Sequence, residues 1–405
     1  MKSSFLNDKK VLLGVTAGIA AYKTAALVRL FIKAGAQVKV IMTPAAKDFV
    51  TPLTLSTLSK NPVLTEFYDK EDSGAVWKNH VELGLWADVF IIAPATANTL
   101  SKMVNGASDN LLLATYLSAK CKVYFAPAMD LDMYKHPSTT KSFQTLISYG
   151  NVMIPSGEGE LASGLSGKGR MAEPETIIDF IEKDIVKGLP LLDKQVLITA
   201  GPTYEAIDPV RFIGNYSSGK MGIALAQTAG DLGASVHLIL GPSAEVIEHP
   251  MVTVHRVVSA SQMFHKVQEF YGKTDVGIAA AAVADYRPKV VATQKIKKKT
   301  DDFTLELEKT VDILKWMGTN KKSQLLVGFA LETQNELENA KSKLKNKNLD
   351  WIVLNSLNDK GAGFQKSTNK VTLVNHKLEV QTFPLKTKKE VAGDIFSAIQ
   401  KEIYA

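Results

Sequence analysis

Apolar runs and amphipathic stretches alternate along the first half of the chain. Four apolar runs have the length of buried strands, at residues 11–15, 37–42, 89–93 and 123–126. Between the first two runs, residues 19–34 show the periodicity of an amphipathic helix that ends at Gly35. A strand, a helix and a second strand at this spacing predict parallel pairing, so the first half is expected to be an α/β domain.

The second half shows the same alternation. Strand-like apolar runs lie at residues 196–199, 236–240, 252–257 and 275–280, and helices are predicted between them. The loop after the first of these strands carries no GxGxxG pattern, which argues against ordinary NAD binding. The predicted fold class is therefore α/β, with two doubly wound Rossmann-like domains of mainly parallel sheets, the first flavodoxin-like.

Gly188-Leu189-Pro190 marks the boundary between the halves, which gives a first domain at 1–188 and a second at 189–405. A glycine-rich segment at about 156–171 precedes this boundary. Glycine carries high backbone entropy, so such a segment should be mobile unless a ligand orders it. It is either a disordered linker or a flap that covers a site.

Small or hydroxyl-bearing residues follow the strands of the first half, as in the turns Pro94–Thr99 and Pro127–Asp130. In a parallel sheet these turns gather at the carboxyl ends of the strands, where ligands bind. They suit a flat aromatic cofactor with a phosphate tail, but they also permit tight packing of strands on helices. The pattern leaves both interpretations open. His80, at a predicted helix start, is by itself more often a surface or capping residue than a catalyst.

The turn that precedes the helix at Lys220 resembles a phosphate-binding loop. Ser217 and Ser218 are expected to cap the helix, and the N–H groups of a helix start attract anions. Gly214 to Lys220 nearly spells the Walker A pattern, but Met221 replaces the hydroxyl that binds magnesium. A P-loop NTPase is therefore rejected, and a nucleotide site remains open beside an ordinary serine-capped helix.

Composition narrows the classes of function. The chain has 405 residues, a net charge of +7 and one cysteine, Cys121. One cysteine excludes an intramolecular disulfide and a cysteine-based zinc site, and it favours a reducing, cytoplasmic compartment. Lysines cluster at 295–299 and 341–347, as expected of a solvated face, of a nucleic-acid surface or of a site for a phosphorylated small ligand. No apolar run is long enough to predict a membrane span.

Several of these motifs together resemble a known family. The turns at Gly18–Ala21, Pro94–Thr99 and Pro127–Met129, with Asn79-His80 and the flap end Gly167–Met171, are similar to the flavin-dependent cysteine decarboxylases. The stretch from Ala200 to Gly222 resembles the phosphopantothenate–cysteine ligases. The two in this order resemble the bifunctional enzymes of coenzyme A biosynthesis over nearly the whole chain.

The resemblance implies that the first half is a decarboxylase of phosphopantothenoylcysteine. It implies FMN as cofactor, held by Gly18, Ile19, Ala20, Ala21, Thr43, Ala95, Thr96, Ala97, Asn98 and Thr99. His80 matches the family's active-site histidine, which assists thiol deprotonation. Asp130 and Met133 are expected to contact the substrate.

Two positions depart from the family pattern. Asp130 stands where asparagine usually contacts the substrate carboxylate, and an ionised Asp130 would repel that group unless it points elsewhere. Ser163 stands where the flap usually carries a proton-donating cysteine, and a hydroxyl is a far weaker acid than a thiol. The proton donor of the last step is therefore an open question, with Ser163 as the residue at that position.

For the second half, the resemblance implies a ligase that condenses 4′-phosphopantothenate with cysteine. CTP and Mg²⁺ serve as co-substrate and metal, and the intermediate is an acyl-cytidylate. Lys295 would stabilise charge on the α-phosphate, and Asn215 would hold the acyl carbonyl. Asp285 would meet the nucleotide or its magnesium. The implied CTP contacts are Ala279, Ala280, Ala281, Asp285, Lys295, Asp312, Phe329, Lys343 and Lys347.

Residues 295–298, Lys-Ile-Lys-Lys, alternate like a strand, and without the resemblance they read as an edge strand protected by lysine. Lys343 and Lys347 lie four residues apart on a predicted helix, so one face carries both. The family further implies a homo-oligomer of decarboxylase trimers joined through ligase dimers, with no nucleic-acid or membrane partner. The alternative is a protein in which only the ligase acts and the first half is a flavin-binding scaffold or regulatory module.

Overall fold

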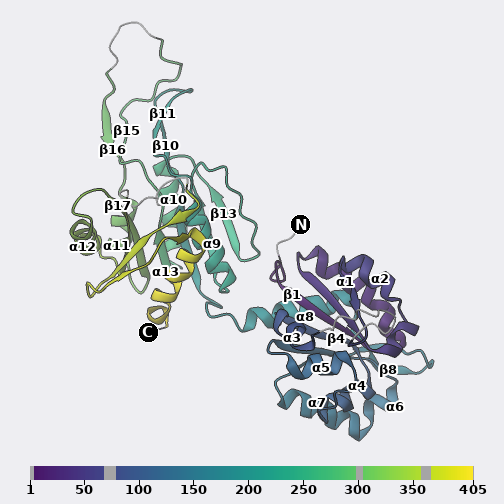
Figure 1. Ribbon diagram of the computed structural model, residues 1–405. Helices are drawn as coiled ribbons and strands as arrows, with labels where there is room; N and C mark the ends of the chain where they lie inside the picture. Colours follow the sequence, from purple (N-terminus) through teal and green to yellow (C-terminus); the bar gives the residue numbers. More distant parts are fainter. Residues whose placement is uncertain (1–3, 68–78, 298–303, 357–365, 405) are drawn as a thin grey trace, which may run out of the picture. The chain divides into compact units, whose positions relative to one another are not determined.

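A computed structural model of the chain describes residues 4–67, 79–297, 304–356 and 366–404. The chain forms two compact units, Met1–Lys187 and Gly188–Ala405 (Figure 1). Each unit is an α/β sandwich with its own sheet, and each is described separately below. None of the described helices is both long and apolar enough to cross a lipid bilayer.

The first unit contains a six-stranded sheet in which every pairing is parallel. The strand order is β3-β2-β1-β4-β5-β6. The strands are β1 (Lys10–Val15), β2 (Gln37–Met42), β3 (Val63–Leu64), β4 (Val89–Ala95), β5 (Lys122–Pro127) and β6 (Val152–Met153). Without the two-residue edge strand β3, this is the flavodoxin-like order, so the predicted fold class of this half is confirmed.

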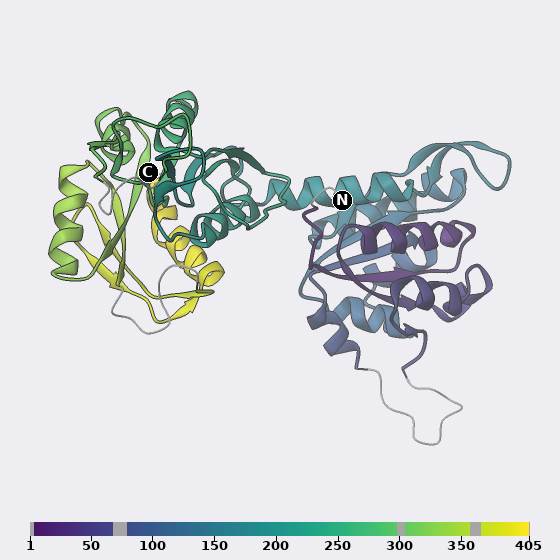
Figure 2. The same ribbon diagram turned by 90° about the horizontal axis from the view of Figure 1, so that it is seen from above.

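Helices cover both faces of this sheet because successive strand residues point to opposite sides. Leu13 of β1 packs with α1 and α8, which lie side by side (Figure 2). Leu12 packs on the other face with α3, α4, α5 and α7. The helices of this unit are α1 (Thr24–Lys33), α2 (Pro52–Ser59), α3 (His80–Trp86), α4 (Ala97–Val104), α5 (Leu111–Ser118), α6 (Leu131–Lys135), α7 (Pro137–Ser148) and α8 (Pro174–Lys187), with 3₁₀ turns η1 (Ile19–Lys23) and η2 (Pro44–Asp48).

Two local details differ from the sequence expectation. The predicted helix at 19–34 begins with the 3₁₀ turn η1, a tightening that is common at helix starts. The glycine-rich segment is an antiparallel hairpin of β7 (Gly157–Glu160) and β8 (Ser166–Arg170), which we call the flap. The flap packs closely on the turn after β5: Met129 N–H donates to the carbonyl of Gly169 at 3.0 Å. An irregular linker is therefore the wrong interpretation of this segment.

The second unit contains an eight-stranded sheet in the order β13-β12-β9-β14-β17-β18-β20-β21. The first six strands are parallel and the last two antiparallel, which confirms the prediction of a mainly parallel, Rossmann-like sheet. The strands are β9 (Gln195–Ala200), β12 (Ser235–Leu240), β13 (Val252–Arg256), β14 (Val276–Ala279), β17 (Leu325–Glu332), β18 (Trp351–Ser356), β20 (Val371–Asn375) and β21 (Val380–Thr382).

The second sheet also buries a core on each face. Ile198 of β9 packs with α9 and α13, and its neighbour Leu197 packs with α10, α11 and α12. The helices are α9 (Lys220–Asp231), α10 (Ala260–Tyr271), α11 (Ile313–Thr319), α12 (Glu336–Asn346) and α13 (Lys388–Ile403). Three short antiparallel strand pairs lie outside this sheet in the described part of this unit: β10 (Tyr204–Ala206) with β11 (Phe212–Gly214), β15 (Tyr286–Pro288) with β16 (Leu307–Lys309), and β19 (Thr368–Asn369) with β22 (Lys386–Thr387).

Candidate functional site

Each sheet reverses its direction of winding at one point, between β1 and β4 in the first unit and between β9 and β14 in the second. In open α/β sheets, ligands bind outside the carboxyl ends of the strands at such a point. Each unit has a cavity there, of about 550 Å³ in the first and about 760 Å³ in the second. Both volumes lie in the range of small-molecule sites.

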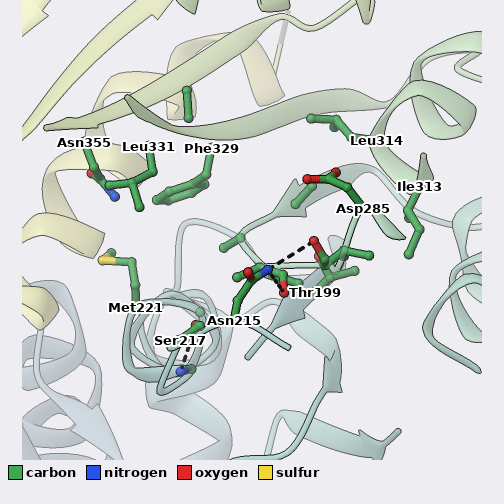
Figure 3. A pocket seen from close by; sticks show the side chains of 18 of the residues that line it. Thr199, Asn215, Ser217, Met221, Asp285, Ile313, Leu314, Phe329, Leu331 and Asn355 are labelled. Carbon is green, nitrogen blue, oxygen red and sulfur yellow. Dashed lines mark hydrogen bonds between the residues drawn. The ribbon is translucent and has the colours of Figure 1, made fainter. Parts of the chain in front are cut away.

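The second cavity lies between β9, the start of α9 and the strand β17 (Figure 3). Its floor is Thr199 at the end of β9, and one side is the loop Ser217–Gly219. The opposite side carries Phe329 and Leu331 of β17 (Figure 3). Five lysines and two aspartates line it: Lys220, Lys309, Lys343, Lys347, Lys388, Asp285 and Asp312. The cavity is therefore suited to an anion that also carries an apolar or aromatic part.

The start of α9 is shaped by two glycines. Gly219 is the N-cap and has a φ of 81°, a left-handed conformation that favours glycine. A Cβ on Gly222 would lie 2.3 Å from the Cβ of Ala200, so only glycine lets α9 approach β9 this closely. The expected serine cap is absent, because Ser217 Oγ accepts from Gly219 N–H and no side chain caps α9 among the described residues. The first turn of α9 borders the cavity, and its N-cap residue, Gly219, has no side chain that could occupy the helix start.

Lys343 and Lys347 both line the cavity, as their spacing predicted. Lys343 Nζ donates to the carbonyl of Phe329 at 2.9 Å, and Lys347 forms an ion pair with Asp312 at 3.0 Å. Burial and the nearby Lys347 lower the pKa of the Lys343 amine, against the opposing effect of Glu332, Asp312 and Asp285. Burial alone would raise the pKa of Asp312, but hydrogen bonds from the Lys315 amide and Lys347 bring it below its usual range.

The other predicted ligase residues divide into two groups. Asn215 lines the cavity, and its Nδ2 donates to the carbonyls of Ala282 at 3.1 Å and Val283 at 3.3 Å (Figure 3). The cavity is also lined by Ala279, Ala280, Ala281, Asp285, Asp312 and Phe329. Lys295 does not line it and is exposed. Residues 295–297 form no strand, and Lys298 lies outside the described residues, so the edge-strand interpretation is wrong for the described part.

The first cavity has a different composition. It is lined by Thr43, Thr96, Ala97, Asn98 and Thr99, all predicted as FMN contacts, and by Met133, predicted as a substrate contact. Thr16 Oγ1 donates to the carbonyl of Pro94 at 2.7 Å and so ties the turn after β1 to the end of β4. The hydroxyl of Thr43 is buried and has no hydrogen-bond partner among the described residues. A buried polar atom without a partner is costly, so a polar ligand atom fits here.

The predicted phosphate contacts Gly18, Ile19, Ala20 and Ala21 follow Ala17, which does line the first cavity. None of the four lines the cavity itself: Gly18 is the extended N-cap residue of η1, and the other three form the first part of η1. A Cβ on Gly18 would lie 3.3 Å from Thr96 Cγ2, so this turn passes close to the turn after β4. Ala95 is buried in the core beside the cavity and does not line it.

Three predicted decarboxylase residues lie outside the lining of the first cavity. His80 begins α3, and its Nδ1 is buried without a hydrogen-bond partner among the described residues. Asp130 caps α6 by accepting from Leu131 N–H at 2.7 Å. The same oxygen accepts from the Ser163 hydroxyl at 2.9 Å. Asp130 and Ser163, the two residues that depart from the family pattern, are thus hydrogen-bonded to each other, and Asp130 points to the flap.

Several lining residues had no sequence signal. Asn355 on β18, Asn369 on β19 and Lys388 at the start of α13 reach the second cavity from segments far apart in the chain. In the first cavity, Lys102 and Asp109 line the edge and form an ion pair. Lys220 belongs to the near-Walker pattern, which predicts a phosphate-binding loop but no role for the lysine side chain itself.

Comparison with known proteins agrees with this division of the chain. The Flavoprotein family matches residues 2–186, and the family described as DNA/pantothenate metabolism flavoprotein C-terminal domain matches residues 191–403. The chain is 45% identical over 399 residues to the coenzyme A biosynthesis bifunctional protein of Bacillus subtilis (strain 168), covering 97% of each chain. It is 42% identical over 404 residues to the protein of that name from Vibrio cholerae, covering 98% of this chain and 99% of the other.

One relative carries another name. The chain is 53% identical over 355 residues to a cysteine/cysteine sulfinic acid decarboxylase from an unknown prokaryotic organism, covering 86% of this chain and 98% of that protein. Among solved structures, the C-terminal domain of a coenzyme A biosynthesis bifunctional protein is 46% identical, with a TM-score of 0.46, over 54% of this chain and 99% of that one. The two family matches and the near full-length relatives show that this chain belongs to the family of bifunctional coenzyme A biosynthesis proteins.

Proposed function

We propose that the second unit of this bifunctional enzyme condenses 4′-phosphopantothenate with cysteine at the expense of CTP. The observation that carries the proposal is the second cavity, where five lysines and the start of α9 surround one space beside Phe329. Lysines and helix amides suit a triphosphate, and an aromatic ring suits a base. The acyl-cytidylate forms when the carboxylate of 4′-phosphopantothenate attacks the α-phosphate and pyrophosphate leaves.

The roles of Lys343, Lys347 and Asn215 follow from their positions in the cavity, whereas the role of Lys295, which does not line the cavity, follows from the family resemblance alone. Lys343 and Lys347 neutralise the phosphates, and Lys295 stabilises the charge that develops on the α-phosphate. Asn215 has both amide protons directed to backbone carbonyls, which fixes its side chain and leaves Oδ1 available to the substrate. The amine of cysteine then attacks the acyl carbon, and CMP leaves.

Magnesium fits this cavity in one specific way. The described residues contain no cluster of three or more histidine, cysteine, aspartate or glutamate side chains that could enclose a metal ion. Asp285 is exposed to the cavity as a carboxylate. Mg²⁺ commonly binds through one or two carboxylates together with substrate phosphates, so Asp285 would hold it jointly with the nucleotide.

We further propose that the first cavity holds FMN. The unpartnered Thr43 hydroxyl and the polar side chains of Thr96, Asn98 and Thr99 fit a ligand with hydrogen-bonding groups on a flat ring. When bound, the flavin supplies hydride acceptance and return, which allows the carboxylate of phosphopantothenoylcysteine to leave as carbon dioxide. In the chain itself, His80 would take the thiol proton and Met133 would contact the substrate. The flap with Ser163 would exclude water.

The position of His80 supports a homo-oligomer. His80 does not line the first cavity of its own chain, so a second copy offers a way to bring a histidine to it. In the second unit, Val210, Phe212 and Tyr216 expose apolar surface on and beside the hairpin β10–β11. This surface is consistent with pairing of ligase units. Decarboxylase trimers joined through ligase dimers would satisfy both features. The ligase-only alternative is not favoured by the near full-length bifunctional relatives.

A second candidate concerns the substrate of the decarboxylase half. The 53% identical relative is named for cysteine and cysteine sulfinic acid, and Asp130 with Ser163 departs from the pattern for phosphopantothenoylcysteine. This half would then act on a free amino acid, whose ammonium group suits a nearby carboxylate better than a substrate carboxylate does.

One experiment tests both candidates. The purified chain is incubated under low oxygen with 4′-phosphopantothenate, cysteine, CTP and Mg²⁺, and the product is identified by mass spectrometry. The expected product is 4′-phosphopantetheine. Parallel reactions contain cysteine or cysteine sulfinic acid alone. Carbon dioxide release there, with product arrest at phosphopantothenoylcysteine in the full mixture, would favour the second candidate. No consumption of CTP would reject the ligase proposal.

A further inference from the structure

Asp208 is a buried carboxylate in the turn between β10 and β11, with only 2% of the residue exposed. Its Oδ1 accepts from the backbone N–H groups of Val210 at 2.8 Å and Arg211 at 2.9 Å. Its Oδ2 accepts from Arg211 Nε at 3.0 Å and Nη2 at 2.6 Å. The hydrogen bonds from Arg211 hold the pKa of Asp208 well below its usual range, so the group is ionised at neutral pH.

The same carboxylate also holds a segment that lies far away in the sequence. Oδ2 accepts from the backbone N–H of Ile296 at 3.1 Å, and Arg211 Nη2 donates to the Ile296 carbonyl at 2.9 Å. Both backbone groups of Ile296 are therefore bound by the Asp208–Arg211 pair. Close by, the N–H of Ala292 donates to the carbonyl of Ile207 at 3.0 Å. Ile296 lies directly between the exposed side chains of Lys295 and Lys297.

The turn itself does not require these bonds. Oδ1 already satisfies the turn's amides, and Ile207 N–H donates to the Arg211 carbonyl at 2.8 Å to close it. The second oxygen and the guanidinium are directed to Ile296 instead. A lysine side chain is long and flexible, so the position of its amine depends on how firmly its backbone is held. Segments without a strand partner, such as 295–297, gain that restraint only from such contacts.

We infer that Asp208, acting with Arg211 through the backbone of Ile296, is a positioning residue for Lys295. The inference rests on the proposed role of Lys295 in activating 4′-phosphopantothenate. Misplacing a reacting group by about 1 Å costs about 10²-fold in rate, so loosening the anchor should lower the activation rate on the order of 10-fold. The affinity for CTP should change less, since Asp208 does not line the cavity.

A double-mutant cycle tests this inference. The single-turnover rate of pyrophosphate release is measured with CTP, Mg²⁺ and 4′-phosphopantothenate but no cysteine, for the wild type, Asp208→Asn, Lys295→Gln and the double variant. Lys295→Gln should lose about 10²-fold or more. If Asp208 acts through Lys295, adding Asp208→Asn to Lys295→Gln should cause no further loss. A full second 10-fold loss in the double variant would show an independent structural role and overturn the inference.

Hydrogen exchange supplies a readout that does not need activity. In the full chain, Asp208→Asn should accelerate exchange in a peptide covering residues 292–297. Asp350→Asn is the matched control, because Asp350 also binds one cation, Lys321, and one backbone amide, that of Leu326. That variant should leave exchange in this peptide unchanged. Unchanged exchange in Asp208→Asn would overturn the anchor itself.

These measurements separate failure of the inference from failure of the proposed function. Absence of pyrophosphate release in the wild type would reject the ligase proposal, whereas the exchange data would still decide whether Asp208 holds the segment. If Asp208→Asn does not fold, Ile296→Pro removes the N–H that Asp208 accepts and leaves Asp208 intact. It should reproduce the loss of activation rate, and wild-type activity in Ile296→Pro would count against the inference.

Discussion

The two cavities occupy equivalent positions in their sheets, yet their linings differ in charge. The cavity of the second unit has five lysines against two aspartates, while the cavity of the first has one lysine, Lys102, paired with Asp109. The first is instead lined by hydroxyls, amides and small apolar groups. The doubly wound fold therefore fixes where a ligand binds, and the side chains at the strand ends decide which ligand it is.

The largest expected effect concerns the lysines of the second cavity. Lys343→Met should lower ligase kcat/KM for CTP by about 10²-fold, because it removes the cation to which we assign neutralisation of the phosphates. Flavin binding should not change. Lys321→Met is the control: Lys321 is also shielded from solvent and pairs with Asp350 outside the cavity. Equal losses of ligase activity in the two folded variants would contradict the proposed role of Lys343.

The next effect lies at the flap of the first unit. Ser163→Cys should increase the fraction of decarboxylated product that is re-reduced, on the order of 10-fold, because a thiol is a far stronger acid than a hydroxyl. Product ratios are measured by mass spectrometry under low oxygen. Ser166→Cys places a thiol elsewhere in the same flap and should have no effect.

Substitution of Thr43 should have opposite effects on the stability of the flavin-free protein and on its affinity for flavin. Thr43→Val removes a buried hydroxyl that has no internal partner, so the flavin-free protein should keep its thermal stability or gain some. Flavin affinity should fall by roughly 10-fold, equivalent to about 1.4 kcal/mol. Thr24→Val is the contrasting variant, because Thr24 Oγ1 donates to the Ala21 carbonyl and its loss should destabilise even the flavin-free protein. Fluorescence titration and thermal melts measure both effects.

The smallest effect is a dependence of stability on pH in the second unit. His237 Nδ1 and His255 Nε2 lie 3.0 Å apart beside Phe270, with Lys266 and Glu269 nearby. Burial lowers the pKa of both imidazoles, and for His255 the neighbouring His237 and Lys266 add to this. A lowered pKa in the folded state means that the unfolded chain binds protons more readily. Stability is therefore fully present above about pH 6.5 and decreases as the pH falls.

Thermal melts at pH 7.5 and 5.5 measure this dependence. The wild type should lose more stability than His237→Gln between these values, since the variant lacks one of the two protonating groups. An equal loss in both proteins would show that other groups dominate the acid sensitivity.

Much of the fold follows from the sequence pattern, for a physical reason. Strands of a parallel sheet are covered on both faces, so β1, β4 and β9 appear as continuous apolar runs that are easy to identify. The flavodoxin-like and Rossmann-like orders follow from right-handed crossovers between such strands. The Lys-Ile-Lys alternation at 295–297 led to the wrong prediction of an edge strand. Its backbone is held by hydrogen bonds from a distant turn rather than by a neighbouring strand.

The candidate sites are less evident in the sequence than the fold. Cavity residues that share one strand end, such as Thr96–Thr99, can be predicted from the single turn that contains them. Lys388 and Asn369 come from segments more than a hundred residues after β9 and meet the same cavity only through the folded sheet. The hydrogen bond between Asp130 and Ser163 could not be inferred either, because no pattern in the sequence links these two positions, which lie 33 residues apart.

Each sheet has a hydrophobic core on both faces, which gives four cores in the described part of the chain. Each of these cores consists of residues from one unit only. Substitutions at the flap of the first unit therefore leave the packing of the second unit untouched. Departures such as those at Ser163 and Asp130 can therefore occur in the first unit without disturbing the hydrophobic cores of the second. One continuous chain thus carries two units whose sequences can vary separately.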